Sequence, residues 1–236
     1  MMSKKIRVKI RTLHKWVAVI VGIQLTLWIV SGAYFAWISI ENVRGDTNRV
    51  EVLSQDIPVS DLFPPAHLNF PTGYRLKFLK LDLTPKGFIY RLESKEGEIS
   101  TFEAKSGRKM DFLSIDEAKT IAMSQVKNQS SGINIALIHA KNSEYKGPVP
   151  VYRVELDDRL STRLYTDPWN GKLILQRNSL WRIYDFLWML HIMDYSTRED
   201  FNNPWLRVAA TAALGIIVSG YLLFAFQRPA RKKKHS

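Results

Sequence analysis

Residues 16–40 read WVAVIVGIQLTLWIVSGAYFAWISI and contain no Asp, Glu, Lys, Arg or His. Roughly 20 apolar residues in a helix are enough to cross the hydrocarbon core of a bilayer. A buried helix of a soluble protein is the alternative, but an uncharged run of this length is rare in such a helix. The stretch therefore predicts a membrane protein whose first transmembrane helix covers residues 16–40.

A second uncharged stretch lies near the other end of the chain, where residues 208–226 read VAATAALGIIVSGYLLFAF. Pro204 precedes it and Pro229 follows it. Proline is favoured in the first turn of a helix and cannot continue a helix beyond its end. We therefore expect a second transmembrane helix at residues 204–227.

The basic residues at both ends predict the orientation of the chain. Residues 1–15 and 228–236 carry eleven Lys and Arg and no acid, which leaves 34 less 11, or 23, basic residues against 22 acidic ones between them. Lys- and Arg-rich flanks mark the cytoplasmic side of a span. Both basic tails are therefore predicted to be cytoplasmic and the intervening region periplasmic, in a bacterial inner membrane. Nucleic-acid binding has little support, because the excess of basic over acidic residues is concentrated in these flanks.

Several chemistries are excluded or lack support. The chain has no cysteine, which excludes disulfides, thiolate catalysis, iron–sulfur clusters and Cys-ligated haem or zinc. No Walker loop, dinucleotide fingerprint, HExxH or nucleophile elbow occurs. A cleaved signal peptide is the alternative for the N-terminus, but the apolar run exceeds the ~7–15 residues of a signal core.

The region between the spans predicts an α+β fold. Ser114 and Glu117 have the pattern of a capping box, which predicts a helix from residue 115 to about residue 127. Alternating apolar residues and turn signals predict strands at residues 74–83, 88–93, 98–104, 133–140, 151–156, 162–166 and 172–176.

Two parts of this region are similar to each other. Residues 89–93 (IYRLE) match residues 151–155 (VYRVE), and in both cases an aromatic strand and a glycine turn follow. We therefore expect a tandem repeat with units at residues 41–113 and 114–178. A chance similarity between two hairpins is the alternative.

The order of motifs resembles a known family. Residues 165–173 (YTDPWNGKL) follow a helix that opens Asp-Glu-Ala and an aromatic-Arg strand, and this order resembles the PepSY domain. LHKW at residues 13–16 with Ser-Gly at residues 31–32 resembles the opening of PepSY-associated transmembrane proteins. LH at residues 190–191 with Ser-Gly at residues 219–220 repeats the pattern. The resemblance covers nearly the whole chain and implies a periplasmic PepSY-like α+β region between two spans.

Two histidines are candidates for chemistry. The helix face around His14 is mostly small, which allows close approach of a partner helix or a flat ligand; it comprises Ala18, Gly22, Leu25, Ile29, Gly32 and Ala36. His191 lies in the aromatic stretch LWRIYDFLWMLHIMDY, and residues 179–203 are expected to form an interfacial helix and loop. A neutral imidazole in apolar surroundings is a capable haem ligand. The alternatives are a boundary histidine beside a packing stripe and an ordinary hydrogen-bonded interfacial residue. Asp194 is close in sequence, but its role as a partner of His191 stays open.

The resemblance implies that His14 and His191 are axial ligands of haem b iron, as in four-helix relatives that reduce ferric siderophores. This chain has two spans, with the histidines roughly 30 Å apart. Bis-histidine ligation therefore requires a second copy, as in a homodimer, or another membrane subunit. His67 and His139 have no partner at ligand spacing, and His235 lies in the basic tail.

The expected function is electron transfer across the membrane to a periplasmic acceptor such as a ferric chelate, as a component of a ferric or ferric-siderophore reductase. The alternative is a haem-free, membrane-anchored PepSY module that binds a periplasmic peptide, protease or membrane complex.

Overall fold

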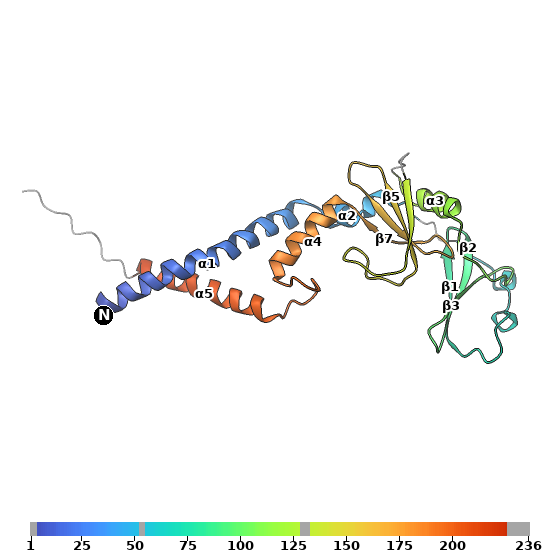
Figure 1. Cartoon of the computed structure of the whole chain (residues 1–236), viewed down its shortest axis with the longest axis horizontal. Helices are drawn as coiled ribbons and strands as arrows, with labels where there is room; N and C mark the ends of the chain where they lie inside the picture. The colour runs from blue at the N-terminus through green and yellow to red at the C-terminus, as the bar shows by residue number, and fades with distance from the viewer. Residues whose placement is uncertain (1–3, 52–54, 128–132, 226–236) are drawn as a thin grey trace, which may run out of the picture. The chain divides into compact units, whose positions relative to one another are not determined.

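The computed structural model describes residues 4–51, 55–127 and 133–225 (Figure 1). The predicted basic tail at residues 228–236 lies outside these ranges. The chain forms two compact units, one from residues 1–39 and 182–236 and the other from residues 40–181. The described part of the first unit is helical, and the second contains two antiparallel sheets. The predicted mixture of helices and strands between two apolar helices is therefore confirmed.

Two helices in the first unit are long and apolar enough to cross a membrane. Helix α1 spans Lys4–Trp37 and α5 spans Pro204–Ala225. Large apolar side chains project from them, and Ile20 and Phe224 are 73% and 74% exposed. An apolar surface of this kind suits contact with lipid. Helix α1 begins well before the predicted residue 16, because the basic residues that precede the apolar run are good helix formers.

Helix α5 runs alongside the N-terminal half of α1, and α4 lies along the C-terminal part of α1 (Figure 1). Helix α4 spans Ser179–Ile192, and a positive φ of 55° at Met193 ends it. Asn203 caps α5, because its Oδ1 accepts the backbone N–H of Leu206 at 3.0 Å. Pro204 then occupies the first helical position, where its missing N–H is not needed.

The second unit contains a three-stranded sheet of order β1-β2-β3 and a four-stranded sheet of order β4-β5-β6-β7. The strands are β1 Leu76–Thr84, β2 Gly87–Ser94, β3 Ile99–Glu103, β4 Ile133–Ile138, β5 Val151–Leu156, β6 Arg163–Thr166 and β7 Leu173–Arg177. The short helices are α2 Ile40–Arg44, η1 Asp46–Asn48, η2 Val59–Asp61 and η3 Pro65–His67. The predicted strands are therefore confirmed to within a few residues at their ends.

Each sheet has its own apolar core. In the first sheet, Tyr90, Leu92 and Phe102 are buried and pack with Leu68. In the second, helix α3 (Ile115–Ser124) covers the sheet, and its core residues are Ala118, Ala122, Tyr152, Val154 and Leu164. Alanines on α3 allow the helix to lie close to the strands.

Helix α3 begins as predicted and ends earlier. Ser114 and Glu117 form the capping box in full. The predicted end at residue 127 is wrong, because the chain leaves the helix at Gln125. The Gln125 side chain donates to the carbonyl of Gly171 at 2.8 Å and accepts the N–H of Leu173 at 2.8 Å, which ties the helix end to the turn before β7.

The strands that carry the similar sequences are the middle strands of two antiparallel meanders, but their registers differ. Tyr90 opposes Phe102 in the first sheet, whereas Arg153 opposes Tyr165 in the second. The connection at residues 157–162 is two residues longer than the one at residues 95–98, which accounts for the offset. The tandem repeat stays a prediction.

Candidate functional site

His14 lies on α1 and contacts α5. Its Nδ1 atom is 2.7 Å from the hydroxyl oxygen of Ser219. A Cβ atom placed on the next residue, Gly220, would lie 3.6 Å from Cε1 of the imidazole. A serine followed by a glycine therefore provides a hydrogen-bond partner and an open backbone surface beside the ring.

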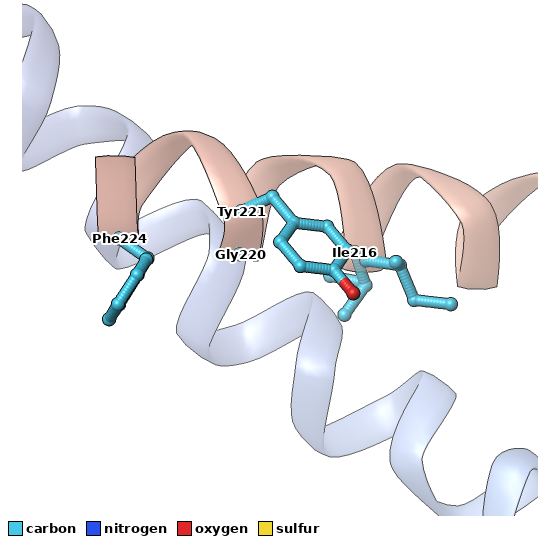
Figure 2. A pocket seen from close by; sticks show the side chains of 5 residues that line it. Ile216, Gly220, Tyr221 and Phe224 are labelled. Atoms are coloured by element: carbon cyan, nitrogen blue, oxygen red, sulfur yellow. The ribbon is translucent and has the colours of Figure 1, made fainter. Parts of the chain in front are cut away.

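Gly220 also lines an open groove of about 500 Å³ on α5. Figure 2 shows the side chains of Ile216, Tyr221 and Phe224 projecting from α5 around Gly220. The groove is apolar apart from the Tyr221 hydroxyl, so its chemistry suits a lipid chain or the apolar face of a flat cofactor. It places an apolar surface close to the His14 end of the helix pair.

His191 lies on α4 and contacts α1. Its Nδ1 atom is 2.6 Å from the hydroxyl oxygen of Ser31, which is fully buried. Three aromatic rings surround the imidazole: the ring of Phe35 at 5.7 Å, that of Trp28 at 6.3 Å and that of Trp188 at 6.4 Å between centroids. Burial lowers the pKa of His191, which favours the neutral imidazole, the form that binds metals.

Side chains of α1 hold the C-terminal end of α4 in place. Gln24 donates to the carbonyl of Leu190 at 3.1 Å, and Trp28 donates to the carbonyl of His191 at 2.7 Å. Carbonyls in the last turn of a helix have no partner within the helix. Gln24, Trp28, Ser31 and Phe35 recur at helical spacing and so share one face of α1. This face fixes both the backbone and the ring of His191.

The two histidines contact helix α1 and its neighbours at opposite ends of α1: His14 lies near its N-terminal end, and His191 contacts Ser31 near its C-terminal end. Ser31, the partner of His191, is 31 − 14 = 17 residues beyond His14 on α1. At 1.5 Å per residue this is about 25 Å along the helix axis. A single iron atom cannot be ligated by both side chains of one chain.

In the part of the chain that the structure describes, no hydrogen bond joins the Nε2 atom of His14 or of His191. Gly22 and Gly32, on the small face of α1, have no heavy atom within 4 Å of an added Cβ from other described segments. The Nε2 atoms and the backbone at these two glycines are therefore not contacted by other described segments of this chain.

The other candidates occupy different positions. Asp194 does not serve the imidazole in this arrangement; it accepts hydrogen bonds from its own loop, among them those of the Thr197 hydroxyl and the backbone N–H of Asp200. His67 lies beside the ring of Phe63 at 6.4 Å between centroids. Within the described residues, no group of three or more His, Asp or Glu is placed to hold a metal ion.

Sequence reasoning recorded Ser31 and Ser219 only as members of Ser-Gly pairs, and it missed their hydrogen bonds to the histidines. The available signal was a polar residue inside each apolar span, because such residues usually find a partner within the bundle.

No family model, curated protein or solved structure matches this chain.

Proposed function

We propose that the chain is a haem-b-binding membrane protein that passes electrons across the bacterial inner membrane to a periplasmic acceptor such as a ferric chelate. One observation supports this most: each histidine contacts a serine of a second helix through Nδ1, and its Nε2 has no hydrogen bond to the described residues. A histidine that ligates a metal through one ring nitrogen typically makes a hydrogen bond through the other.

The residues present fit a haem. His14 and His191 would hold the iron through Nε2, and haem would supply a one-electron Fe(III)/Fe(II) couple. The aromatic rings around His191 provide apolar surroundings in which the neutral imidazole is favoured. The apolar groove beside Gly220 offers similar surroundings near His14.

A second copy of the chain would complete each site. One chain provides a single imidazole at each end of the helix pair, and the two ends are about 25 Å apart. The open positions at Gly22 and Gly32 suit the close approach of another helix. A homodimer would therefore contain a His14 pair near the cytoplasm and a His191 pair near the periplasm; another membrane subunit could provide the same ligands.

The test uses the full-length protein, produced in cells supplied with a haem precursor and purified in detergent. We expect a reduced-minus-oxidised spectrum with a Soret band and sharp α and β bands. His14→Ala and His191→Ala should each lower the haem content, and the haem that remains reports that the fold is intact. His67→Ala and His139→Ala are the matched controls and should keep the full spectrum. A colourless wild-type protein would refute haem binding, and full haem content in both His14→Ala and His191→Ala would refute the ligand assignment.

One observation favours the second candidate, a haem-free anchored module that binds a periplasmic peptide. Strand β1 is at the edge of its sheet, and Leu76, Phe78 and Leu81 are 45%, 40% and 37% exposed. An extended peptide can add a strand to such an edge. The module is favoured if the protein lacks haem and an extended peptide competes with labelling of a cysteine placed at Phe78.

A further inference from the structure

We infer that Ser31 and Ser219 are positioning residues that set the tautomer of the two histidines. Each serine hydroxyl accepts Nδ1–H and thereby leaves the lone pair of Nε2 free. The role of that lone pair towards iron rests on the proposed function; the tautomer itself does not.

The hydrogen bonds of Ser31 carry the argument for His191. A serine hydroxyl has one hydrogen to donate and can accept as well. The Ser31 hydroxyl lies 2.7 Å from the carbonyl of Leu27 and 2.6 Å from Nδ1 of His191. If the hydroxyl donates to the carbonyl, Nδ1–H can donate to the hydroxyl and both contacts are satisfied. The opposite tautomer would require the hydroxyl to turn its only hydrogen to Nδ1 and to give up its contacts with the carbonyls of Leu27 and Trp28 at 2.7 and 3.1 Å.

The same arrangement occurs at the other end of the helix pair. The Ser219 hydroxyl donates to the carbonyl of Ile216 at 2.9 Å and lies 2.7 Å from Nδ1 of His14. If the hydroxyl hydrogen again stays within its own helix, the imidazole supplies the hydrogen of the second contact. This arrangement favours the same tautomer for both histidines, with the proton on Nδ1 when the ring is neutral.

The two contacts cross between the helices. Ser31 on α1 holds the histidine of α4, and Ser219 on α5 holds the histidine of α1. Because the same serine–histidine contact occurs at two independent positions, we take it to be a functional feature of both sites. Removal of such an outer partner typically lowers metal affinity 10–100-fold at the histidine concerned.

The experiment measures the tautomers directly in protein without haem. Full-length chain is produced in haem-deficient cells with ¹⁵N-histidine and reconstituted in lipid nanodiscs. The ¹⁵N signals of the ring nitrogens are recorded at a pH at which both rings are neutral, and they are assigned by His→Gln changes. We expect His14 and His191 to carry the proton on Nδ1. Nε2 protonation of both rings in the wild type would overturn the inference.

The serine variants act as controls for each other. Ser31→Ala should shift the His191 signals towards Nε2 protonation and leave those of His14 unchanged, whereas Ser219→Ala should do the reverse. Ser31→Thr keeps the hydroxyl and should restore the wild-type signals of His191. Unchanged His191 signals in Ser31→Ala would contradict the assignment, and the unaffected histidine shows that the helix pair is still folded.

Haem-loaded protein separates this inference from the proposed function. We expect Ser31→Ala to weaken haem retention at the His191 site about 10–100-fold and to raise the midpoint potential, because the ligand loses the hydrogen bond that makes it more basic. Nδ1 protonation in a wild-type protein that binds no haem would contradict the proposed function alone. Haem binding with Nε2 protonation in the apo-protein would contradict the serine roles alone.

Discussion

Arg91 of β2 donates through Nη1 to Oδ2 of Asp167 at 2.8 Å, which joins the first sheet to the turn between β6 and β7. The Asp167 side chain is 5% exposed and that of Arg91 is 25% exposed. The same carboxylate accepts the backbone N–H of Trp169 at 2.9 Å. One buried side chain therefore shapes a turn and also fixes the two sheets of this unit to each other.

Replacing Arg91 by Ala should destabilise the protein, because it leaves the Asp167 carboxylate buried without its charged partner. We expect a loss of about 2–4 kcal/mol in the free energy of unfolding. Thermal or denaturant unfolding of the full chain, followed by tryptophan fluorescence, measures it. Arg75→Ala is the control, because Arg75 and Glu96 form an exposed pair with side chains 67% and 49% exposed. Its cost should be at most about 1 kcal/mol; equal losses would contradict the argument.

Gly171→Ala should cost more than Gly73→Ala, although both glycines have a left-handed backbone, with φ of 73° and 81°. An added Cβ at Gly171 would lie 2.5 Å from Cγ2 of Ile121, whereas nothing lies within 4 Å at Gly73. The Gly73 variant therefore measures backbone strain alone, about 1 kcal/mol, and steric overlap raises the Gly171 loss to about 2–4 kcal/mol. Unfolding midpoints of the two variants test the difference.

The capping box of α3 should make the stability of the protein depend on pH in the acidic range. Hydrogen bonds from the backbone and hydroxyl of Ser114, with Lys86 nearby, lower the pKa of Glu117 from 4.5 to about 2. Because the pKa of Glu117 is lower in the folded state than in the unfolded state, the ionised carboxylate stabilises the fold at pH values above about 4.5. This contribution is lost as the pH falls from about 4.5 towards 2. Glu117→Gln should remove this part of the pH dependence. Melting curves between pH 6 and pH 2 test it, and identical acid profiles for variant and wild type would contradict it.

Trp28→Phe should weaken the attachment of α4 to α1, because it removes the donor to the carbonyl of His191 and leaves a smaller aromatic ring in its place. The orphaned carbonyl should cost about 1–3 kcal/mol. Trp37→Phe is the matched control, since Trp37 is 84% exposed, and it should have little effect. The thermal unfolding midpoints of the two variants are compared in detergent. Equal midpoints would contradict the role assigned to Trp28.

The proposed orientation is testable because the chain has no cysteine. We expect Val59→Cys, at a position 83% exposed, to react with a membrane-impermeant maleimide added to intact cells with a permeable outer membrane. Thr12→Cys, on the basic part of α1, should react only after the inner membrane is broken. The opposite pattern would reverse the proposed orientation.

Local patterns predicted most of the secondary structure. Val151–Leu156 was expected as a strand and is β5 with the same ends, because alternation and flanking turns are local signals. The histidines were found as candidates from their positions beside the apolar spans. Their partners were not, because Ser31 and Ser219 lie 160 and 205 residues from the histidines that they bind. Contacts over such separations depend on how the helices pack against each other, and the periodicity of apolar residues does not predict that packing.

Helix α1 sets the spacing between the two imidazoles. His14 is part of α1, and the imidazole of His191 contacts Ser31 of the same helix. Inserting one residue between these positions would turn Ser31 by about 100° around the axis and move it along by about 1.5 Å. An insertion or deletion in this interval would therefore turn Ser31 away from His191, whereas a substitution would keep the spacing between His14 and Ser31.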